Sequence, residues 1–366
     1  ASWPIVVLVK IAVRYRHQSS SSSMAAVDVP RASLSAELRE HEKSEPLLKE
    51  NTRRWVMFPV EYPNLYDMYK KHTAAFWTAE DVDVAQDVQD WEGLSGDEKQ
   101  FLRQVLAMFL TFDKGILADS AGRMSTEIQS PEARGFYGFQ ITMESIHAEA
   151  TARIMGQLIR DKEERGRLLD SARAMPAVAD RSAWASTYLD PELSFTERLL
   201  AFACVQCIFR GGAYCAIFSL KQRGLMPGLT FANERISRDK CMHADFAALL
   251  YSMLGHRLPE DAAQRIARGA VEAERRLICE ALPSDLVGAG REEMGAYVEF
   301  VADRLLVALG HEKAFGVSCP FQWASMAELP DREHFAEKQE GGDRAASKTP
   351  AGGEAKEEVF AMDQEF

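Results

Sequence analysis

Two histidine-containing stretches carry the residues best placed for metal chemistry. Glu144 precedes His147 by three positions, and Lys240 precedes His243 by the same spacing. Residues three apart share one face of a helix, and a four-helix site for two metal ions needs the Glu-x-x-His pair twice plus two further carboxylates. Here the first pair is complete. In the second, a lysine ammonium without a lone pair stands where the glutamate belongs. The sequence therefore has the spacing of a two-metal site without its full ligand set.

Size and composition favour one large domain that must position these residues. The chain has 366 residues, is 46% hydrophobic and carries a net charge of -12. This acidic charge gives a phosphate backbone no attractive field, which argues against nucleic-acid binding. Its six cysteines are too few for a secreted disulfide scaffold, so we expect reduced thiols in a cytoplasmic protein. The Cys204-x-x-Cys207 motif lacks a second pair at metal-ligand spacing and is expected to be part of the core.

The two ends of the chain differ from its middle in their expected structure. Residues 1–45 are expected to be a disordered or artefactual extension, and residues 46–329 the folded domain. The apolar run Pro4–Val13 could be a signal region, but it is shorter than the roughly 20 residues of a membrane span, so no membrane association is expected. Residues 330–366 are expected to form a flexible tail, because Lys338–Glu358 has no aromatic residue to bury.

Hydrophobic periodicity between Tyr66 and Leu309 is helical almost throughout. Alternating runs typical of strands are nearly absent, so the predicted fold class is all-α, a bundle of long helices. The expected helices are Asp97–Ala118, Pro131–Leu158, Phe195–Leu220, Ser237–Leu254, Pro259–Leu282 and Gly295–Gly310.

Several long segments carry a family resemblance. They include EPLLKENTRRWVMFPVEYPNLYDMYKK, FYGFQITMESIHAE, RGLMPGLTFANERISRD and the ending VFAMDQEF. Over about residues 45–330 and the last eight residues, the chain resembles the small subunit of class I ribonucleotide reductase, eukaryotic type. The resemblance implies a ferritin-like helical dimer that stores a tyrosyl radical beside a di-iron centre. That radical passes to a large subunit, which reduces ribonucleotides to deoxyribonucleotides.

The resemblance also implies a role for each position of the site. The family's metal ligands fall on six residues, of which four are kept and two are changed. The radical tyrosine falls on Thr151, whose hydroxyl cannot hold a stable radical. The kept ligands are Asp113, Glu144, His147 and His243, and the changed ones, both glutamates in the family, are Gln206 and Lys240.

Arg210 adds a second cation to this site. We expect it one helical turn beyond Gln206 on the same face, where the family has an apolar aromatic residue. A buried arginine stays charged and needs a partner. Two cations, Lys240 and Arg210, would balance two carboxylates, Asp113 and Glu144, with Gln206 completing the network. We therefore hypothesise that salt bridges replace the metal cluster, so that no cofactor is expected.

Other interpretations of the same residues remain open. Asp113, Glu144, His147 and His243 could hold a single divalent ion, or the two histidines could be ordinary core residues. Tyr214 lies near the family's radical pocket and could carry a relocated radical. The resemblance also places Trp77 and Asp239 on the family's electron-transfer path through His147. Without a radical source, we expect these two residues to survive as a buried hydrogen-bonded set.

Residues 330–366 suggest that docking on the large subunit is kept while the relay of the radical to it is lost. The family relays the radical through a tyrosine in this segment, but the chain has no tyrosine after Tyr297. The last residues still resemble the peptide that docks on the large subunit, with spaced apolar groups among acids. The docking residues expected from this resemblance are Phe360, Met362, Asp363 and Phe366.

The sequence therefore predicts a cytoplasmic, non-catalytic small-subunit paralogue in an oxidoreductase complex for deoxyribonucleotide synthesis. Its expected partners are the large subunit and a catalytically intact small subunit in a heterodimer, or a second copy of itself. The alternative is a radical-competent small subunit that keeps a metal site or uses a metal-free route. A ferritin-like oxidase is excluded because too few carboxylates remain.

Overall fold

The computed structural model describes residues 28–111, 113–281 and 290–321. Every regular element in these ranges is helical, which confirms the all-α prediction. The helices are α2 (Asp28–Glu42), α3 (Pro63–Ala74), η2 (Ala79–Asp81), α4 (Ala85–Gly93), α5 (Gly96–Thr111), α6 (Asp113–Glu127), α7 (Pro131–Leu158), α8 (Lys162–Ala174), α9 (Pro176–Tyr188), α10 (Phe195–Cys207), α11 (Gly211–Gln222), α12 (Pro227–Met253), α13 (Glu260–Arg275), the π-helix η3 (Arg276–Ala281) and α14 (Arg291–Ala308).

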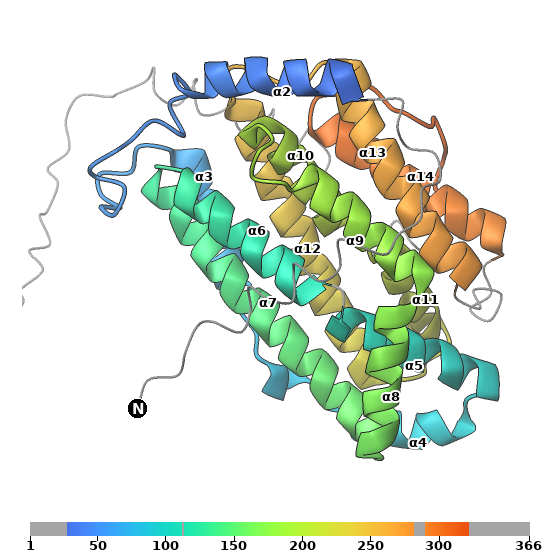
Figure 1. Cartoon of the computed structure of the whole chain (residues 1–366). Coiled ribbons are helices and arrows are strands. Elements are labelled where there is room, and N and C mark those ends of the chain that lie inside the picture. The colour runs from blue at the N-terminus through green and yellow to red at the C-terminus, as the bar shows by residue number, and fades with distance from the viewer. Residues whose placement is uncertain (1–27, 112, 282–289, 322–366) are drawn as a thin grey trace, which may run out of the picture.

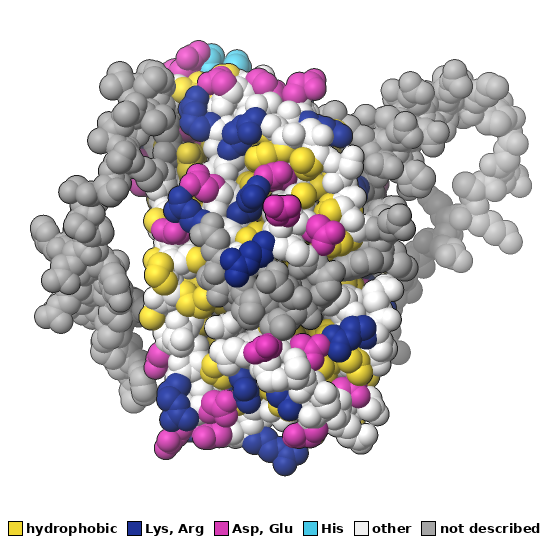
Figure 2. All heavy atoms as spheres, turned by 90° about the vertical axis from the view of Figure 1, so that its right-hand side faces the viewer, with side chains coloured by type: hydrophobic (Ala, Val, Ile, Leu, Met, Phe, Trp, Pro, Cys, Tyr) yellow, Lys and Arg dark blue, Asp and Glu magenta, His cyan; other side chains and the backbone are white. Residues whose placement is uncertain are grey.

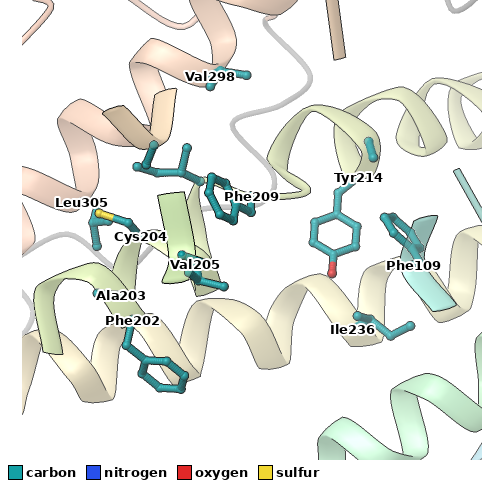
Figure 3. Close-up of a cluster of buried hydrophobic side chains, with 14 of the residues drawn as sticks. Phe109, Phe202, Ala203, Cys204, Val205, Phe209, Tyr214, Ile236, Val298 and Leu305 are labelled. Atoms are coloured by element: carbon teal, nitrogen blue, oxygen red, sulfur yellow. The ribbon is translucent and has the colours of Figure 1, made fainter. Parts of the chain in front are cut away.

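The long helices α7 and α12 form the centre of the bundle, with α6 and α10 beside them (Figure 1). Helix α3 covers α7 on one edge, and α13 and α14 lie on the opposite edge. Aromatic residues join the central helices: the rings of Phe136 on α7 and Phe246 on α12 stack with centroids 3.6 Å apart. Figure 3 shows a second part of the core, where Phe202 and Val205 of α10 lie beside α12.

Helix α7 begins and ends where its sequence predicted. Ser130 caps it by accepting a hydrogen bond from the backbone N–H of Ala133, and Pro131 occupies the first turn, where no N–H is needed. This agreement matters for function because α7 carries Glu144 and His147.

The expected helix Phe195–Leu220 is interrupted, which corrects the predicted position of Arg210. Helix α10 ends at Cys207, and α11 starts at Gly211 after Arg210 with a left-handed φ of 76°. Arg210 therefore does not follow Gln206 on one continuous helix face. A buried carboxylate stabilises the break, because Glu274 Oε1 accepts the Arg210 backbone N–H at 3.1 Å and lies in a buried ion pair with Arg181.

Several other boundaries differ from the sequence prediction. The expected helix Asp97–Ala118 falls on two helices, α5 and α6, and α14 begins at Arg291, four residues before the expected Gly295. Helix α12 begins at Pro227, ten residues before the expected Ser237, because a proline in the first turn starts a helix as readily as it marks a turn. Helix α13 gives way to a π-helix after Arg275. Helix α2 lies within the segment expected to be separate from the fold; its Leu38 is buried, and Glu42 accepts the backbone N–H of Thr196 on α10.

One stretch of the described chain, Phe195–Gln222, is long and apolar enough to cross a membrane. Of its apolar 18-residue window, 89% is buried inside the bundle, as expected for α10 and α11 in the core of a folded domain. The six cysteines are thiols and not disulfides, as expected, and Cys204 is fully buried.

The start of α12 depends on a close approach that only glycine permits. The Asp87 carboxylate accepts the backbone N–H groups of Gly228 and Leu229, and a Cβ on Gly228 would lie 2.1 Å from the Asp83 carbonyl oxygen. We predict that Gly228→Ala lowers the free energy of unfolding by about 1–3 kcal/mol, the usual cost of overpacking. Thermal unfolding followed by circular dichroism measures this loss.

The matched control is Gly166→Ala on α8, where a Cβ meets no atom within 4 Å. Alanine should stabilise that exposed helical position by up to about 1 kcal/mol. Equal effects of the two substitutions would contradict the close approach at Gly228.

Candidate functional site

The centre of the candidate site is a buried ion pair between α7 and α12. Lys240 Nζ lies 2.6 and 2.7 Å from the two carboxylate oxygens of Glu144. The lysine side chain is 4% exposed and the glutamate side chain 11% exposed. The resemblance implies that both residues stand at ligand positions, and here the ammonium occupies both carboxylate oxygens of Glu144.

The protonation of the two groups follows from their contact. Burial alone would raise the pKa of Glu144, but Lys240 and the two neighbouring imidazoles hold that pKa well below its usual range. Burial lowers the pKa of Lys240 to about 8, although Glu144 opposes the shift. At neutral pH the pair is therefore an ammonium and a carboxylate.

A second hydrogen-bonded set adjoins this pair. Asp239 Oδ2 accepts the indole N–H of Trp77 at 2.8 Å and lies 2.9 Å from His147 Nε2. Arg238 donates to Asp239 Oδ1 at 2.9 Å. Despite burial, the pKa of Asp239 falls to about 2, mainly through its bond to His147. The structure thus brings together Trp77, Asp239 and His147 as a buried set, in the form expected from the sequence.

His243 connects the ion pair to residues on two other helices. Its Nδ1 lies 3.3 Å from Glu144 Oε1 and 3.4 Å from Gln206 Oε1 on α10. Its Nε2 faces Nε2 of His72 on α3 at 3.3 Å. Gln206 therefore contacts His243, whereas from the sequence we expect it to complete the network of salt bridges.

His72 and Arg238 are site residues that the sequence analysis missed. His72 is 1% exposed, and burial lowers its pKa to about 3, which keeps the imidazole neutral. Its position on α3, five residues before Trp77, was the available signal. For Arg238, the available signal was its place directly before Asp239 in the second histidine-containing stretch.

Arg210 enters the site from the break between α10 and α11. Its guanidinium donates to the Phe109 carbonyl oxygen at 3.1 Å, lies over the Phe109 ring and approaches the Tyr214 hydroxyl at 3.5 Å. Figure 3 shows the Tyr214 ring beside Phe109, with its hydroxyl directed toward α12. The side chain of Asp113 lies outside the described residues, so its proposed pairing with Arg210 stays a prediction.

Thr151, which the resemblance implies to stand at the radical-tyrosine position, has a local partner. Thr151 is 4% exposed, and its hydroxyl donates to the His147 carbonyl oxygen one turn earlier at 2.8 Å. An aliphatic hydroxyl in such a bond offers no oxidisable ring. The expected docking residues Phe360, Met362, Asp363 and Phe366 lie outside the described residues.

The described side chains do not fit a di-iron centre. Glu144 is held by an ammonium, Gln206 presents a neutral amide, and Lys240 cannot coordinate while protonated. Over the described ranges, no three histidine, cysteine or acidic side chains are placed to hold one metal ion. The described residues form a buried charge network in which an amide and an ammonium stand where the resemblance implies two glutamates.

Comparison with known proteins gives one consistent result. The family model described as "Ribonucleotide reductase, small chain" matches residues 54–320. The ribonucleoside-diphosphate reductase small chain of Nicotiana tabacum is 46% identical over 323 residues, covering 88% of this chain and 98% of that protein. The small chain of Trypanosoma brucei brucei is 43% identical over 329 residues, covering 90% and 97%.

Solved structures agree with the sequence matches. The ribonucleotide reductase Rnr4 homodimer of Saccharomyces cerevisiae is similar with a TM-score of 0.77 and 33% identity, covering 83% of this chain and 96% of that chain. The ribonucleotide reductase R2 subunit of Clostridium botulinum, at 18% identity and a TM-score of 0.70, shares the fold.

The contributions of Lys240 and Glu144 to stability should be strongly coupled. We predict that Lys240→Met and Glu144→Gln each lower the free energy of unfolding by about 3–5 kcal/mol, because each leaves an uncompensated buried charge. The double variant should lose much less than the sum. Denaturant titration of all four proteins completes the cycle.

The control for this cycle is Lys221→Met, which breaks an ion pair with Glu234 of the same 2.6 Å length on the exposed surface. That loss should stay below about 1 kcal/mol. A loss below about 1 kcal/mol for Lys240→Met as well would refute the structural role of the pair.

His72 should make the fold sensitive to acid. The pKa of His72 lies near 3 in the folded chain and near 6.5 in the unfolded chain. Below pH 6.5 the unfolded chain therefore gains a proton that the folded chain does not bind, and the free energy of unfolding falls as the pH drops toward 3. Between pH 7.5 and 5.5 the wild type should lose about 1.4 kcal/mol more than His72→Gln. Denaturant titrations at the two pH values test this, with the exposed His256→Gln as control. Equal losses in the wild type and His72→Gln would contradict it.

Proposed function

The chain belongs to the ribonucleotide reductase small-chain family, and from this premise we propose that it is a non-catalytic small subunit that supports a radical-bearing one. It is a subunit of ribonucleoside-diphosphate reductase, an oxidoreductase complex that makes deoxyribonucleotides. Within that complex its own work would be assembly: pairing with an intact small subunit, stabilising it or assisting its cofactor assembly, and helping to hold the large subunit.

One observation carries this proposal, namely the Lys240 ammonium on both carboxylate oxygens of Glu144. An iron ion at this position would have to displace a buried cation and would meet the Gln206 amide in place of a carboxylate. The cost of removing one partner from a buried ion pair is high. The family's di-iron cofactor is therefore not expected to form on this chain, and Thr151 offers no ring for its radical.

The proposed partners follow from the family. A solved relative, Rnr4 of Saccharomyces cerevisiae, is a homodimer, and we propose a dimer of small chains here as well, with an intact paralogue as the functional partner. Docking on the large subunit is assigned to the terminal residues Phe360, Met362, Asp363 and Phe366. A cytoplasmic location is part of the proposal.

We predict that the purified full chain, supplied with ferrous iron and oxygen, gives no tyrosyl signal in electron paramagnetic resonance and binds fewer than two irons. The reason is that the carboxylate ligands are incomplete and the radical position is a threonine. The small chain of Nicotiana tabacum, treated in the same way, is the positive control. Two irons with a tyrosyl signal would establish a radical-competent subunit instead, and a signal without metal would point to Tyr214.

An activity assay tests the supporting role directly. The chain alone with the large subunit should produce no deoxyribonucleotide, and adding it to a limiting amount of an intact small subunit from the same source should raise the rate. A rate unchanged by the addition would contradict a supporting role.

A further inference from the structure

Two histidines meet on the surface of the bundle at the end where α2 lies. His41 is in the last turn of α2, and His256 lies just beyond the end of α12. Their imidazole rings stack with centroids 3.8 Å apart and planes inclined by 7°. Figure 2 shows histidine side chains at the upper end of the molecule, the end at which α2 lies in Figure 1. The pair therefore joins two segments that are far apart in the sequence.

The rings of this pair have unengaged nitrogens. His256 is exposed and His41 partly exposed, and neither ring has a hydrogen-bond partner among the described residues. By contrast, His311 uses both of its nitrogens: Nδ1 lies 3.0 Å from Glu260 Oε2, and Nε2 lies 2.9 Å from the Tyr251 hydroxyl. A neutral imidazole without a partner keeps an available lone pair, and imidazole is the commonest metal ligand in proteins.

The spacing of the two rings suits one metal ion. Two nitrogens bound to one tetrahedral ion at about 2.0–2.1 Å lie ~3.4 Å apart, and the two ring centroids are 3.8 Å apart. Each ring would have to turn from its stacked position so that a nitrogen lone pair points at the ion. Rotation of a histidine ring about its Cβ–Cγ bond costs little, and both rings border on water.

The charges around the pair favour a cation. Glu45 Oε2 accepts the backbone N–H of Gly255, the residue before the second histidine, at 2.9 Å. The cations of this segment, Arg39 and Lys43, are each paired with a glutamate. Figure 2 shows acidic side chains beside the histidines at this end. Across the described residues, no set of three histidine, cysteine or acidic side chains is placed around one ion, so water would fill the remaining coordination positions.

We propose that His41 and His256 together bind one divalent transition-metal ion of the class that takes imidazole ligands, such as Ni²⁺ or Zn²⁺. The site is separate from the pocket around Lys240 and does not rest on the function proposed above. Two protein ligands with water make it an exchangeable site, unlike a structural zinc site, which has four protein ligands.

A bound ion would attach α2 to a second part of the bundle. Ser35 Oγ accepts the backbone N–H of Ser194 at 3.0 Å, and Glu42 Oε1 accepts that of Thr196 at 3.0 Å. Both of these bonds hold α2 to the start of α10, whereas the ion would join α2 to the connection between α12 and α13. An ion that binds only when α2 is in place stabilises that arrangement by mass action. The site is thus a metal-dependent clamp on α2.

The test is calorimetric titration of the metal-free full chain with nickel chloride. Ni²⁺ is the probe because thiolates select Zn²⁺ and the chain has six cysteine thiols. His41→Gln and His256→Gln should each weaken Ni²⁺ binding at least about tenfold, because even the loss of a group behind a ligand costs 10–100-fold in affinity. The matched control is His311→Gln, whose ring nitrogens are already engaged. It should bind Ni²⁺ as the wild type does. Circular dichroism checks that each variant folds, and ions bound elsewhere cancel in the comparison.

A second measurement covers the case in which a variant fails to fold. On addition of Ni²⁺, deuterium uptake of the wild type should fall in peptides covering residues 34–44 and 250–258. Three results would overturn the proposal: equal Ni²⁺ affinity in all four proteins, weaker binding in only one of the two site variants, or unchanged deuterium uptake in either peptide.

Discussion

A charge that has been removed from water must have a partner, and this constraint governs the centre of the molecule. The Lys240 ammonium is buried between α7 and α12, and the Glu144 carboxylate is the group that compensates it. Neither charge could be kept alone at this depth without a large cost in stability. The pair therefore ties the two longest helices together and at the same time determines which other groups the pocket can accept.

The surrounding polar residues follow from the same requirement. Asp239 is compensated by His147 and Arg238 and also bound by Trp77, while His72 avoids the cost of burial by staying neutral. At the break between α10 and α11, the Glu274 carboxylate accepts the backbone N–H of Arg210. Hydrogen bonds and ion pairs spread over α3, α7, α10 and α12 thus hold the described part of this pocket together.

Periodicity and capping predicted much of this arrangement from the sequence. The bounds of α7 were predictable because Ser130 and Pro131 form a local start signal, and the spacing of Glu144, His147, Lys240 and His243 located the site. The break at Arg210 was not predictable, because it depends on Glu274, which is 64 residues away in the chain and meets Arg210 only after folding. His72 was missed for a similar reason, since its contact with His243 joins helices far apart in sequence.

The lysine at position 240 also constrains which side chains this pocket tolerates. Exchanging it for a glutamate would place two carboxylates side by side in a dry pocket, and mutual repulsion would disfavour the folded chain. Changing Gln206 or Thr151 alone would leave the ammonium on both carboxylate oxygens of Glu144.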